Sequence, residues 1–206
     1  MQQLARDFLD KPYEVHVGSL ELRANKSIKQ VVEVVGDYDK YPRLLEHMKA
    51  FDRNIRALLF VETKKGADQL TNSLRREGDD VVAIHGDKSQ QDRDRALRDF
   101  RNGRCKLLCA TDVASRGLDI KGVEMVVNFD MPQGIEDYIH RIGRTGRAGA
   151  TGVAVSFMTE KHSRLARELT TILKEANQDV PPGLEGMIRR GGGGGGHRGG
   201  GRYRRY

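Results

Sequence analysis

Short apolar runs alternate with longer amphipathic stretches along most of this 206-residue chain. Six runs that are rich in valine, isoleucine and leucine predict β-strands: Gln30–Val35, Ala57–Val61, Val81–Ile84, Lys106–Ala110, Glu124–Asn128 and Val153–Phe157. The stretches between and after them predict α-helices: Tyr38–Ala50, Lys64–Glu77, Gln90–Asn102, Gly134–Arg144 and Glu160–Ala176. Several runs are continuously apolar, which is typical of strands that are covered on both faces. The alternation predicts an α/β fold with a mainly parallel sheet and helices on both faces.

Polar residues follow four of the predicted strands. They are Glu62-Thr63-Lys64, His85-Gly86-Asp87, the segment Thr111–Asp119, and Phe129-Asp130. In a parallel sheet these segments meet at one edge, the carboxyl edge, where α/β proteins bind their ligands. Taken singly, these residues have structural alternatives: Thr63 could cap the helix that begins at Lys64, and His85 could pack at the end of its strand. Four such segments together predict a polar binding edge.

Three arginines and a histidine are concentrated in one octapeptide, His140-Arg141-Ile142-Gly143-Arg144-Thr145-Gly146-Arg147. It lies at the end of a predicted helix, and its glycines allow the backbone to turn before the next strand. The guanidinium groups of Arg144 and Arg147 suit bidentate contacts with phosphate oxygens. A lone arginine could form an ordinary surface salt bridge, but the whole segment favours phosphate binding. An arginine that reaches a γ-phosphate accelerates its hydrolysis by about 10³–10⁵.

The net charge of +7 is unevenly distributed. Six arginines and no acidic residue lie between residues 189 and 206, so that residues 1–188 hold 30 basic and 29 acidic residues. The body of the chain is therefore nearly neutral, and a nucleic-acid footprint on it must be a local patch.

Three segments follow from the composition and the patterns. Residues 1–29 form an irregular lead-in, residues 30–182 form one folded domain, and residues 183–206 form a tail rich in Gly, Arg and Tyr. The tail has too little apolar mass to fold, so we expect it to be disordered. Its arginines could contact RNA phosphates while Tyr203 and Tyr206 stack on bases, or it could be a solubilising linker.

Several kinds of site are absent from the sequence. No G-x-x-x-x-G-K-[ST] motif occurs, so the chain has no P-loop cradle for phosphates. Cys105 and Cys109 would lie roughly 13 Å apart on a strand, beyond the reach of a disulfide, and no Cys/His cluster indicates a metal site. Buried reduced thiols, without a signal peptide or membrane span, predict a soluble intracellular protein of the nucleus and/or cytoplasm with no membrane partner.

The octapeptide has companions elsewhere in the chain. Together with the segment Ala110–Asp119, the run Leu58–Lys64 and the pair Gln90 and Arg93, it resembles motifs of the DEAD-box ATP-dependent RNA helicases. Their order and approximate spacing are those of motifs IV, IVa, V and VI in the second RecA-like domain of that family. The resemblance covers roughly residues 1–182, and Lys174–Gln178 is similar to a branch whose members carry Gly/Arg-rich tails. It implies a RecA-like fold for the folded domain.

The resemblance implies a role for each matching residue. Arg144 and Arg147 correspond to arginine fingers that reach the γ-phosphate of ATP, and His140 and Arg116 to residues that couple the two helicase domains. Asp119 corresponds to the residue that contacts the ribose, and Arg116 and Gly117 are grouped with it at the nucleotide. The residues expected to grip the RNA sugar-phosphate backbone are Thr63, Gly86, Gln90, Arg93 and Thr111.

The remaining family motifs, among them the Walker A lysine and the DEAD box, belong to a first domain and do not occur in this chain. The resemblance therefore implies two partners, RNA and an N-terminal RecA-like domain of the same protein. It also implies ATP with Mg²⁺, held mostly by that N-terminal domain, so the chain by itself is expected not to hydrolyse ATP. Two alternatives stay open: a non-catalytic RNA-binding or annealing module, and part of a related DNA helicase.

Overall fold

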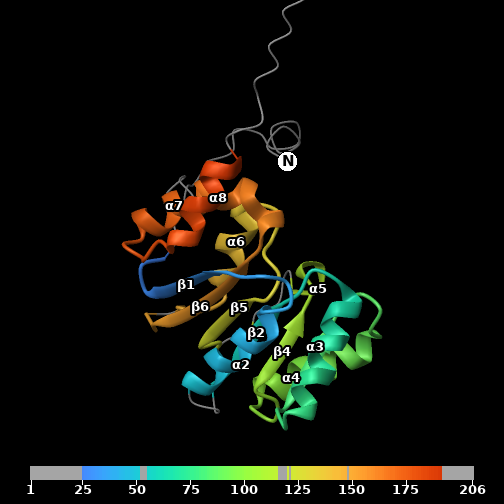
Figure 1. The fold of residues 1–206 in the computed structure, drawn as a ribbon. Helices are drawn as coiled ribbons and strands as arrows, with labels where there is room; N and C mark the ends of the chain where they lie inside the picture. Colours follow the sequence, from blue (N-terminus) through green and yellow to red (C-terminus); the bar gives the residue numbers. More distant parts are fainter. Residues whose placement is uncertain (1–24, 52–54, 116–119, 121, 148, 192–206) are drawn as a thin grey trace, which may run out of the picture.

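The computed structural model describes residues 25–51, 55–115, 120, 122–147 and 149–191. They contain one six-stranded sheet in the order β1-β6-β5-β2-β4-β3, in which every neighbouring pair is parallel (Figure 1). Its strands are β1 Ile28–Val34, β2 Ala57–Phe60, β3 Val81–Ile84, β4 Leu107–Ala110, β5 Met125–Asn128 and β6 Gly152–Met158. The predicted α/β class is confirmed, and all six predicted strands are present.

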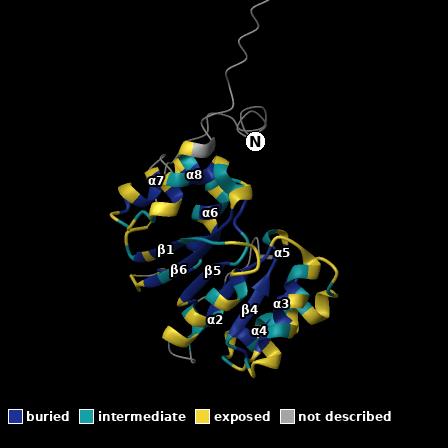
Figure 2. Ribbon diagram, viewed as in Figure 1, coloured by how far each residue is buried: buried dark blue, intermediate teal, exposed yellow. Residues whose placement is uncertain are grey.

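Helices cover both faces of the sheet. They are α2 Lys40–Ala50, α3 Lys64–Arg76, α4 Gln90–Arg101, α5 Asp112–Ser115, α6 Ile135–Ile142, the 3₁₀ helix η1 Glu160–Leu165, α7 Ala166–Glu175 and α8 Pro182–Gly191. Side chains of α2 and α3, such as Leu44 and Leu70, pack on one face, and those of α4, α6, α7 and α8 pack on the other. The strands are buried and the outer sides of the helices are exposed (Figure 2). The loops at the two ends of the strands, where the sheet is not covered by helices, are thus the segments available for a site.

Two predicted helices differ in extent from the observed ones. The region predicted as one helix over residues 160–176 divides into η1 and α7, and within η1 His162 leaves helical geometry at φ −101° and ψ 16°. The Nδ1 atom of His162 lies 3.1 Å from the hydroxyl of Thr159, the residue that caps η1. The helix predicted over Gly134–Arg144 ends at Ile142, so Arg144 falls in the turn that follows.

The prediction of a disordered tail from residue 183 is wrong for residues 183–191, which belong to α8. Leu184 and Met187, three residues apart, are fully buried in the cluster that also contains α7. Gly183 allows this close packing, because a Cβ there would stand 2.9 Å from the Cβ of Val34. Gly183 therefore reflects contact with β1, whereas the sequence pattern shows only a loss of periodicity. Residues 192–206, the rest of the predicted tail, lie outside the described residues.

The boundary predicted for the lead-in also moves. β1 begins at Ile28, and residues 1–24 lie outside the described part of the chain. As an edge strand β1 takes a partner from the C-terminal region, because the N–H of Gln30 donates to Oε1 of Gln178 at 2.8 Å. The side-chain oxygen of Gln30 in turn accepts from the buried hydroxyl of Tyr138 at 2.9 Å. A side chain from the segment after α7 thus satisfies one backbone N–H of the edge strand β1.

Both cysteines are buried free thiols, as predicted. Burial raises the pKa of Cys109 to about 12, so its thiol is protonated and unreactive at neutral pH. Within the described ranges no helix combines the length and the apolar character that crossing a bilayer requires.

Candidate functional site

The parallel sheet brings the segments after β2, β3 and β4 to its carboxyl edge, as the sequence predicts. Thr63, after β2, is exposed, and its Oγ1 accepts a hydrogen bond from the N–H of Gly66 at 2.9 Å. The capping role considered for Thr63 is thus confirmed. Thr111, after β4, is buried, and its N–H donates to the carbonyl of Ile84 at 3.3 Å. Because β2 and β4 are neighbours in the sheet, the two threonines follow adjacent strand ends.

The turn after β3 and the start of α4 carry three more of the predicted RNA-binding residues. Gly86 is exposed and has no left-handed backbone conformation, and a Cβ there would come no closer than 3.5 Å to Lys64. Neither the backbone nor the neighbouring side chains therefore require glycine at this position. Arg93 donates through Nη1 to Oε1 of Gln90 at 3.3 Å, and its buried Nε has no hydrogen-bond partner among the described residues.

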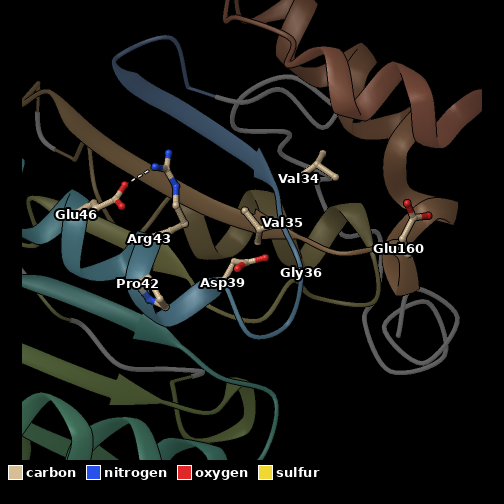
Figure 3. Close-up of a pocket in the computed structure, with 8 residues that line it drawn as sticks. All are labelled: Val34, Val35, Gly36, Asp39, Pro42, Arg43, Glu46 and Glu160. Atoms are coloured by element: carbon tan, nitrogen blue, oxygen red, sulfur yellow. Dashed lines mark hydrogen bonds and ion pairs between the residues drawn. The ribbon is translucent and has the colours of Figure 1, made fainter.

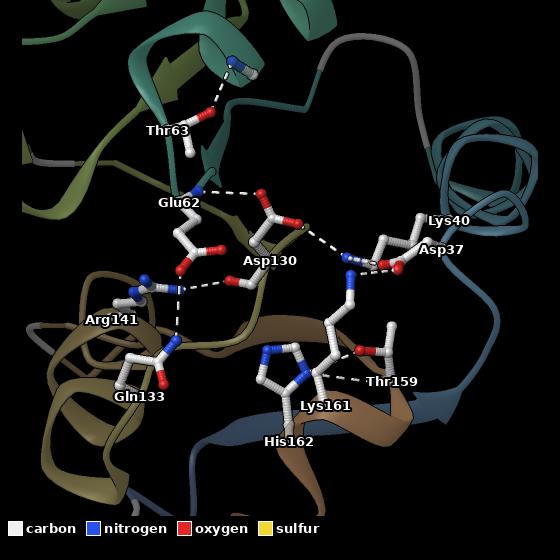
Figure 4. A network of polar contacts seen from close by, with 11 residues as sticks. Asp37, Lys40, Glu62, Thr63, Asp130, Gln133, Arg141, Thr159, Lys161 and His162 are labelled. Atoms are coloured by element: carbon white, nitrogen blue, oxygen red, sulfur yellow. Dashed lines mark hydrogen bonds and ion pairs between the residues drawn. The ribbon is translucent and has the colours of Figure 1, made fainter.

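Arg141 of the octapeptide points into the domain, a role that the sequence analysis missed. It donates at 2.6 Å to each carboxylate oxygen of Asp112, at 3.2 Å to Oδ1 of Asn128 and at 2.7 Å to the carbonyl of Asp130. Figure 4 shows the last of these contacts. The side chain is 4% exposed and lies over the ring of Phe60, 4.9 Å from its centroid. Arg141 therefore ties α6 to the ends of β4 and β5.

The signal for this role is present in the sequence. Tyr138, Arg141 and Ile142 follow the i, i+3, i+4 spacing of one helix face, and all three are buried in α6. His140, the predicted coupling residue, is on the opposite side of that helix and is exposed. Helical spacing therefore distinguishes the buried Arg141 from the exposed His140.

A polar network occupies the carboxyl edge near β1 and β6 (Figure 4). Asp130 accepts the N–H of Glu62 at 3.0 Å with one oxygen and the Nζ of Lys40 at 2.8 Å with the other. Lys40 is buried and also lies 3.2 Å from Asp37, whose second oxygen accepts from Lys161 at 2.6 Å. Both lysines of this network are thus neutralised by carboxylates.

A shallow pocket of about 580 Å³ opens beside the carboxyl end of β1, between α2 and η1 (Figure 3). Arg43 is the one cation among the described residues that line it. Glu33 accepts from the Nε and Nη2 of Arg43 at 2.7 Å each, and Glu46 pairs with Nη1. Asp39 and Glu160 also line the pocket, so its lining is acidic. The β1 side of the carboxyl edge is therefore unfavourable for phosphate.

The arginine turn, residues 143–147, lies at the opposite edge of the sheet, where the strands begin. α6 runs back from the carboxyl edge, and the chain after the turn enters β6 at Gly152. The buried hydroxyl of Thr145 donates to the carbonyl of Val123 at 2.7 Å, just before β5. Asn25 donates through Nδ2 to the carbonyl of Gly146 at 3.0 Å, just before β1. The turn is therefore anchored to the starts of three neighbouring strands.

Two glycines let the arginine turn lie directly against the sheet. Gly146 has φ +64°, and a Cβ there would stand 2.6 Å from Cγ1 of Ile28. A Cβ on Gly152 would stand 2.2 Å from Oγ1 of Thr145. Because a side chain at either position would displace the turn, the glycines help the core to fix where its arginines lie.

Arg144 and Arg147 occupy this turn close to one another. Arg144 is half-buried and Arg147 is exposed, and the Nε of Arg147 donates to the carbonyl of Gly143 at 2.8 Å. Burial, together with the positive charge of Arg147, lowers the pKa of Arg144. Two neighbouring guanidinium groups, both positively charged, attract an anion with several charges, such as a polyphosphate.

Three further residues predicted for the nucleotide, Arg116, Gly117 and Asp119, lie outside the described residues. Their segment joins α5, at the carboxyl edge, to Ile120 and Val123, which are buried beside β5. In the described part of the chain, no group of three or more His, Cys, Asp or Glu side chains is arranged to hold a metal ion.

These features define a RecA-like domain in which the core anchors a turn that carries two arginines. The sequence pattern of the helicase conserved C-terminal domain matches residues 39–149, more than half of the chain, so the chain belongs to that family.

Its relatives are DEAD-box RNA helicases. The chain is 52% identical over 186 residues to the ATP-dependent RNA helicase DBP2 of Eremothecium gossypii, a match that covers 89% of this chain and 33% of that protein. The chain spans about one third of the length of the curated relatives it matches. The resemblance stated from the motifs is therefore confirmed.

Solved structures agree with this assignment. The C-terminal domain of the DEAD-box protein Dbp5 matches with a TM-score of 0.64 and 42% identity, over 72% of this chain and 85% of that one. Dbp5 of S. cerevisiae bound to RNA and ADP BeF3 matches with a TM-score of 0.71 and 36% identity, over 87% of this chain and 46% of that one. The RecA-like fold expected from the sequence is confirmed.

Proposed function

We propose that this chain is the second RecA-like domain of an ATP-dependent RNA helicase, and that the whole protein hydrolyses ATP to separate short RNA duplexes. The observation that carries the proposal is the pair Arg144 and Arg147, which a core-anchored turn holds together. The domain that bears this pair has no P-loop, so its arginines would complete a site whose other half is an N-terminal RecA-like domain.

The arginine turn fits ATP as a substrate. Closely spaced guanidiniums would balance the negative charge that develops on the γ-phosphate during hydrolysis. His140, exposed in the last turn of α6, would contact the other domain, together with Arg116. Asp119 would accept hydrogen bonds from the ribose, with Gly117 beside it. Mg²⁺ would arrive with the nucleotide and be held mainly by the N-terminal domain.

The carboxyl edge at β2, β4 and β3 fits a single RNA strand. Thr63, Gly86, Gln90, Arg93 and Thr111 would contact the sugar-phosphate backbone, which gives affinity without sequence preference. Gly86 supports this role, because nothing within the described fold requires a glycine there and an approaching backbone would. The structure of Dbp5 with RNA and ADP BeF3 supports the choice of RNA.

Replacing Arg147 with alanine in the full-length protein tests the proposal. We expect RNA-stimulated ATP turnover to fall by about 10³ or more, while the unfolding transition stays in place because Arg147 is exposed. Arg167→Ala, an exposed arginine of α7, is the matched control and should leave turnover unchanged. Equal turnover in the Arg147→Ala variant and the wild type would remove the role assigned to the turn.

The 206-residue chain alone should hydrolyse ATP negligibly, because the nucleotide cradle is on the other domain. Purified chain is assayed with and without single-stranded RNA. Robust RNA-stimulated hydrolysis would overturn the proposal that ATP hydrolysis requires the N-terminal domain.

A second function, RNA binding or annealing through the tail, is favoured by the six arginines and the absence of acids in residues 189–206. Because α8 extends to Gly191, the proper comparison is the chain with and without residues 192–206. If the tail contributes, its removal should flatten the salt dependence of RNA binding by about 0.7 log units per lost phosphate contact. An equal slope would show that the tail takes no part. Stimulation of the full-length ATPase by RNA, compared with DNA, decides between an RNA and a DNA helicase.

The reduced, buried cysteines support a nuclear or cytoplasmic location for this protein. Imaging of the tagged full-length protein tests that placement.

A further inference from the structure

The turn after β3 is joined to α3 by a group of charged side chains. Asp68 lies 2.9 Å from the Nζ of Lys88 and 3.1 Å from the Nε2 of His85. One helical turn earlier, Lys64 pairs with Asp87. We call these five residues the α3 clamp. They link the first two turns of α3, which begins just after Thr63, to the turn that contains Gly86.

Sheet topology explains why such a link matters. β4 lies between β2 and β3, so the backbone ladder connects the ends of β2 and β3 only through β4. β3 is also an edge strand of four residues, with a neighbour on one side only. The α3 clamp provides a direct side-chain connection between the segments that follow β2 and β3. It therefore bridges the two segments that contain Thr63 and Gly86.

His85 is an unusual member of the α3 clamp because it is 3% exposed. Neither of its ring nitrogens makes a hydrogen bond of good geometry with the described residues, and Asp68 is the carboxylate that faces Nε2. A buried imidazole with incomplete hydrogen bonding costs stability. The packed strand-end role considered for His85 accounts for its burial but not for the carboxylate beside it.

Asp68 is the centre of the α3 clamp. Its partial burial tends to raise the pKa of the carboxyl, but the nearby Lys88 ammonium and His85 ring outweigh burial, and the pKa is lowered. The carboxylate thus holds both ends of the short turn from residue 85 to residue 88. The N–H of Lys88 closes the same turn by donating to the carbonyl of His85 at 3.1 Å.

We propose that the α3 clamp is a positioning device for RNA: it holds the 85–88 turn at the distance from Thr63 that matches successive phosphates of a single strand. This inference rests on the RNA-helicase function proposed above. None of the five side chains needs to touch the nucleotide. Their removal raises the RNA concentration required for stimulation and leaves turnover at saturating RNA unchanged.

The charges of Lys64 and Asp87 allow a test that separates positioning from simple attraction. In the full-length protein, RNA-stimulated ATPase is measured against RNA concentration for Lys64→Asp, Asp87→Lys and the double swap. If the clamp positions the turn, both single variants raise the half-saturating RNA concentration about fivefold. The double swap restores the ion pair and returns this concentration to within about twofold of the wild-type value. Simple charge attraction predicts that the two single variants change the half-saturating RNA concentration in opposite directions. Asp87→Lys adds positive charge and would then strengthen RNA binding.

Lys65→Asp is the matched control, because Lys65 is exposed on α3 and outside the clamp. It reports the effect of charge alone in the same helix. Asp68→Asn extends the test, since it removes a negative charge and is nevertheless expected to weaken RNA binding. Lys64 and Asp87 are 53% and 65% exposed, so their variants should fold, which a thermal unfolding scan verifies.

The outcomes also separate the clamp from the proposed function. If the wild-type full-length protein shows no RNA-stimulated ATPase, the proposed function fails first. If the wild type is stimulated but Asp87→Lys binds RNA more tightly, or the double swap does not recover, the clamp is overturned alone. A fall in saturating turnover with unchanged half-saturation would likewise overturn it, because the α3 clamp would then act on hydrolysis.

Discussion

The arginine turn and the turn after β3 both present groups suited to phosphate, but different forces hold them. The arginine turn rests on buried hydrogen bonds and on glycines that admit no side chain. The turn after β3 is held by ion pairs whose side chains are between 34% and 65% exposed. Exposed pairs contribute up to about 1 kcal/mol and are screened by salt, whereas buried contacts are not. The comparison teaches that the core fixes the turn that carries the proposed arginine fingers, whereas the turn proposed to contact RNA is held by ion pairs that salt can weaken.

The largest effect should come from Arg141, which ties α6 to the ends of β4 and β5. Arg141→Met leaves the Asp112 carboxylate without its bidentate partner, and we expect the free energy of unfolding to fall by about 3 kcal/mol. Urea unfolding of the chain measures it. The control Arg147→Met, at an exposed position, should change the free energy by less than about 0.5 kcal/mol. Equal losses in both variants would contradict the distinction between the two arginines.

Gly152→Ala tests the arginine turn more narrowly. The new Cβ would stand 2.2 Å from Oγ1 of Thr145 and 2.6 Å from the backbone nitrogen of Gly146, so the turn must move. We expect a loss of about 1–3 kcal/mol of stability and a fall in ATP turnover of the full-length protein on the order of tenfold to a hundredfold. Gly186→Ala, where a Cβ would meet no atom within 4 Å, is the control. Unchanged turnover in Gly152→Ala would mean that the arginines do not depend on the turn's position.

On the RNA side, Ser89→Ala should have a smaller effect. The hydroxyl of Ser89 caps α4 by accepting the N–H of Asp92 at 3.1 Å, and α4 carries Gln90 and Arg93. Loss of the cap should cost about 1 kcal/mol of stability and raise the half-saturating RNA concentration without lowering saturating turnover. Ser73→Ala, inside α3, is the control. A drop in saturating turnover for Ser89→Ala would contradict the expectation that α4 affects RNA binding and not ATP hydrolysis.

The smallest effect concerns pH. Because the pKa of Asp68 is lower in the folded protein than in the unfolded chain, its contribution to stability is present above the unfolded pKa of about 3.9 and is lost as pH falls through the folded pKa. The difference in unfolding free energy between the wild type and Asp68→Asn should therefore be constant near neutral pH and shrink below about pH 4. Denaturant titrations from pH 7 to pH 3 measure this difference. A constant difference over the whole range would show that Asp68 gains nothing from Lys88 and His85.

Much of the fold could be predicted because its signals are local. The six strands, the parallel class and the capping by Thr63 and Ser89 all follow from periodicity and from residues a few positions apart. α8 could not be predicted in the same way. Its helix is secured by Leu184 and Met187 against α7 and by Gly183 against β1, contacts with residues distant in the sequence.

The candidate site divides in the same manner. The polar segments of the carboxyl edge and the arginines of the octapeptide were identifiable from residue type and spacing. The inward direction of Arg141 was readable from helical spacing, but its partners on β4 and β5 were not. The roles of Arg144 and Arg147 at ATP, and of Thr63 and Gly86 at RNA, stay predictions.

The sequence by itself determined the alternation of strands and helices, the family, and which residue types stand ready for phosphate, because these depend on local order along the chain. Tertiary structure alone decided that β4 separates β2 from β3, and that the arginine turn lies at the opposite edge from the residues proposed to contact RNA. It also decided which arginine is buried. The physical reason is that strand order and side-chain burial arise from packing between distant segments, which no local pattern specifies.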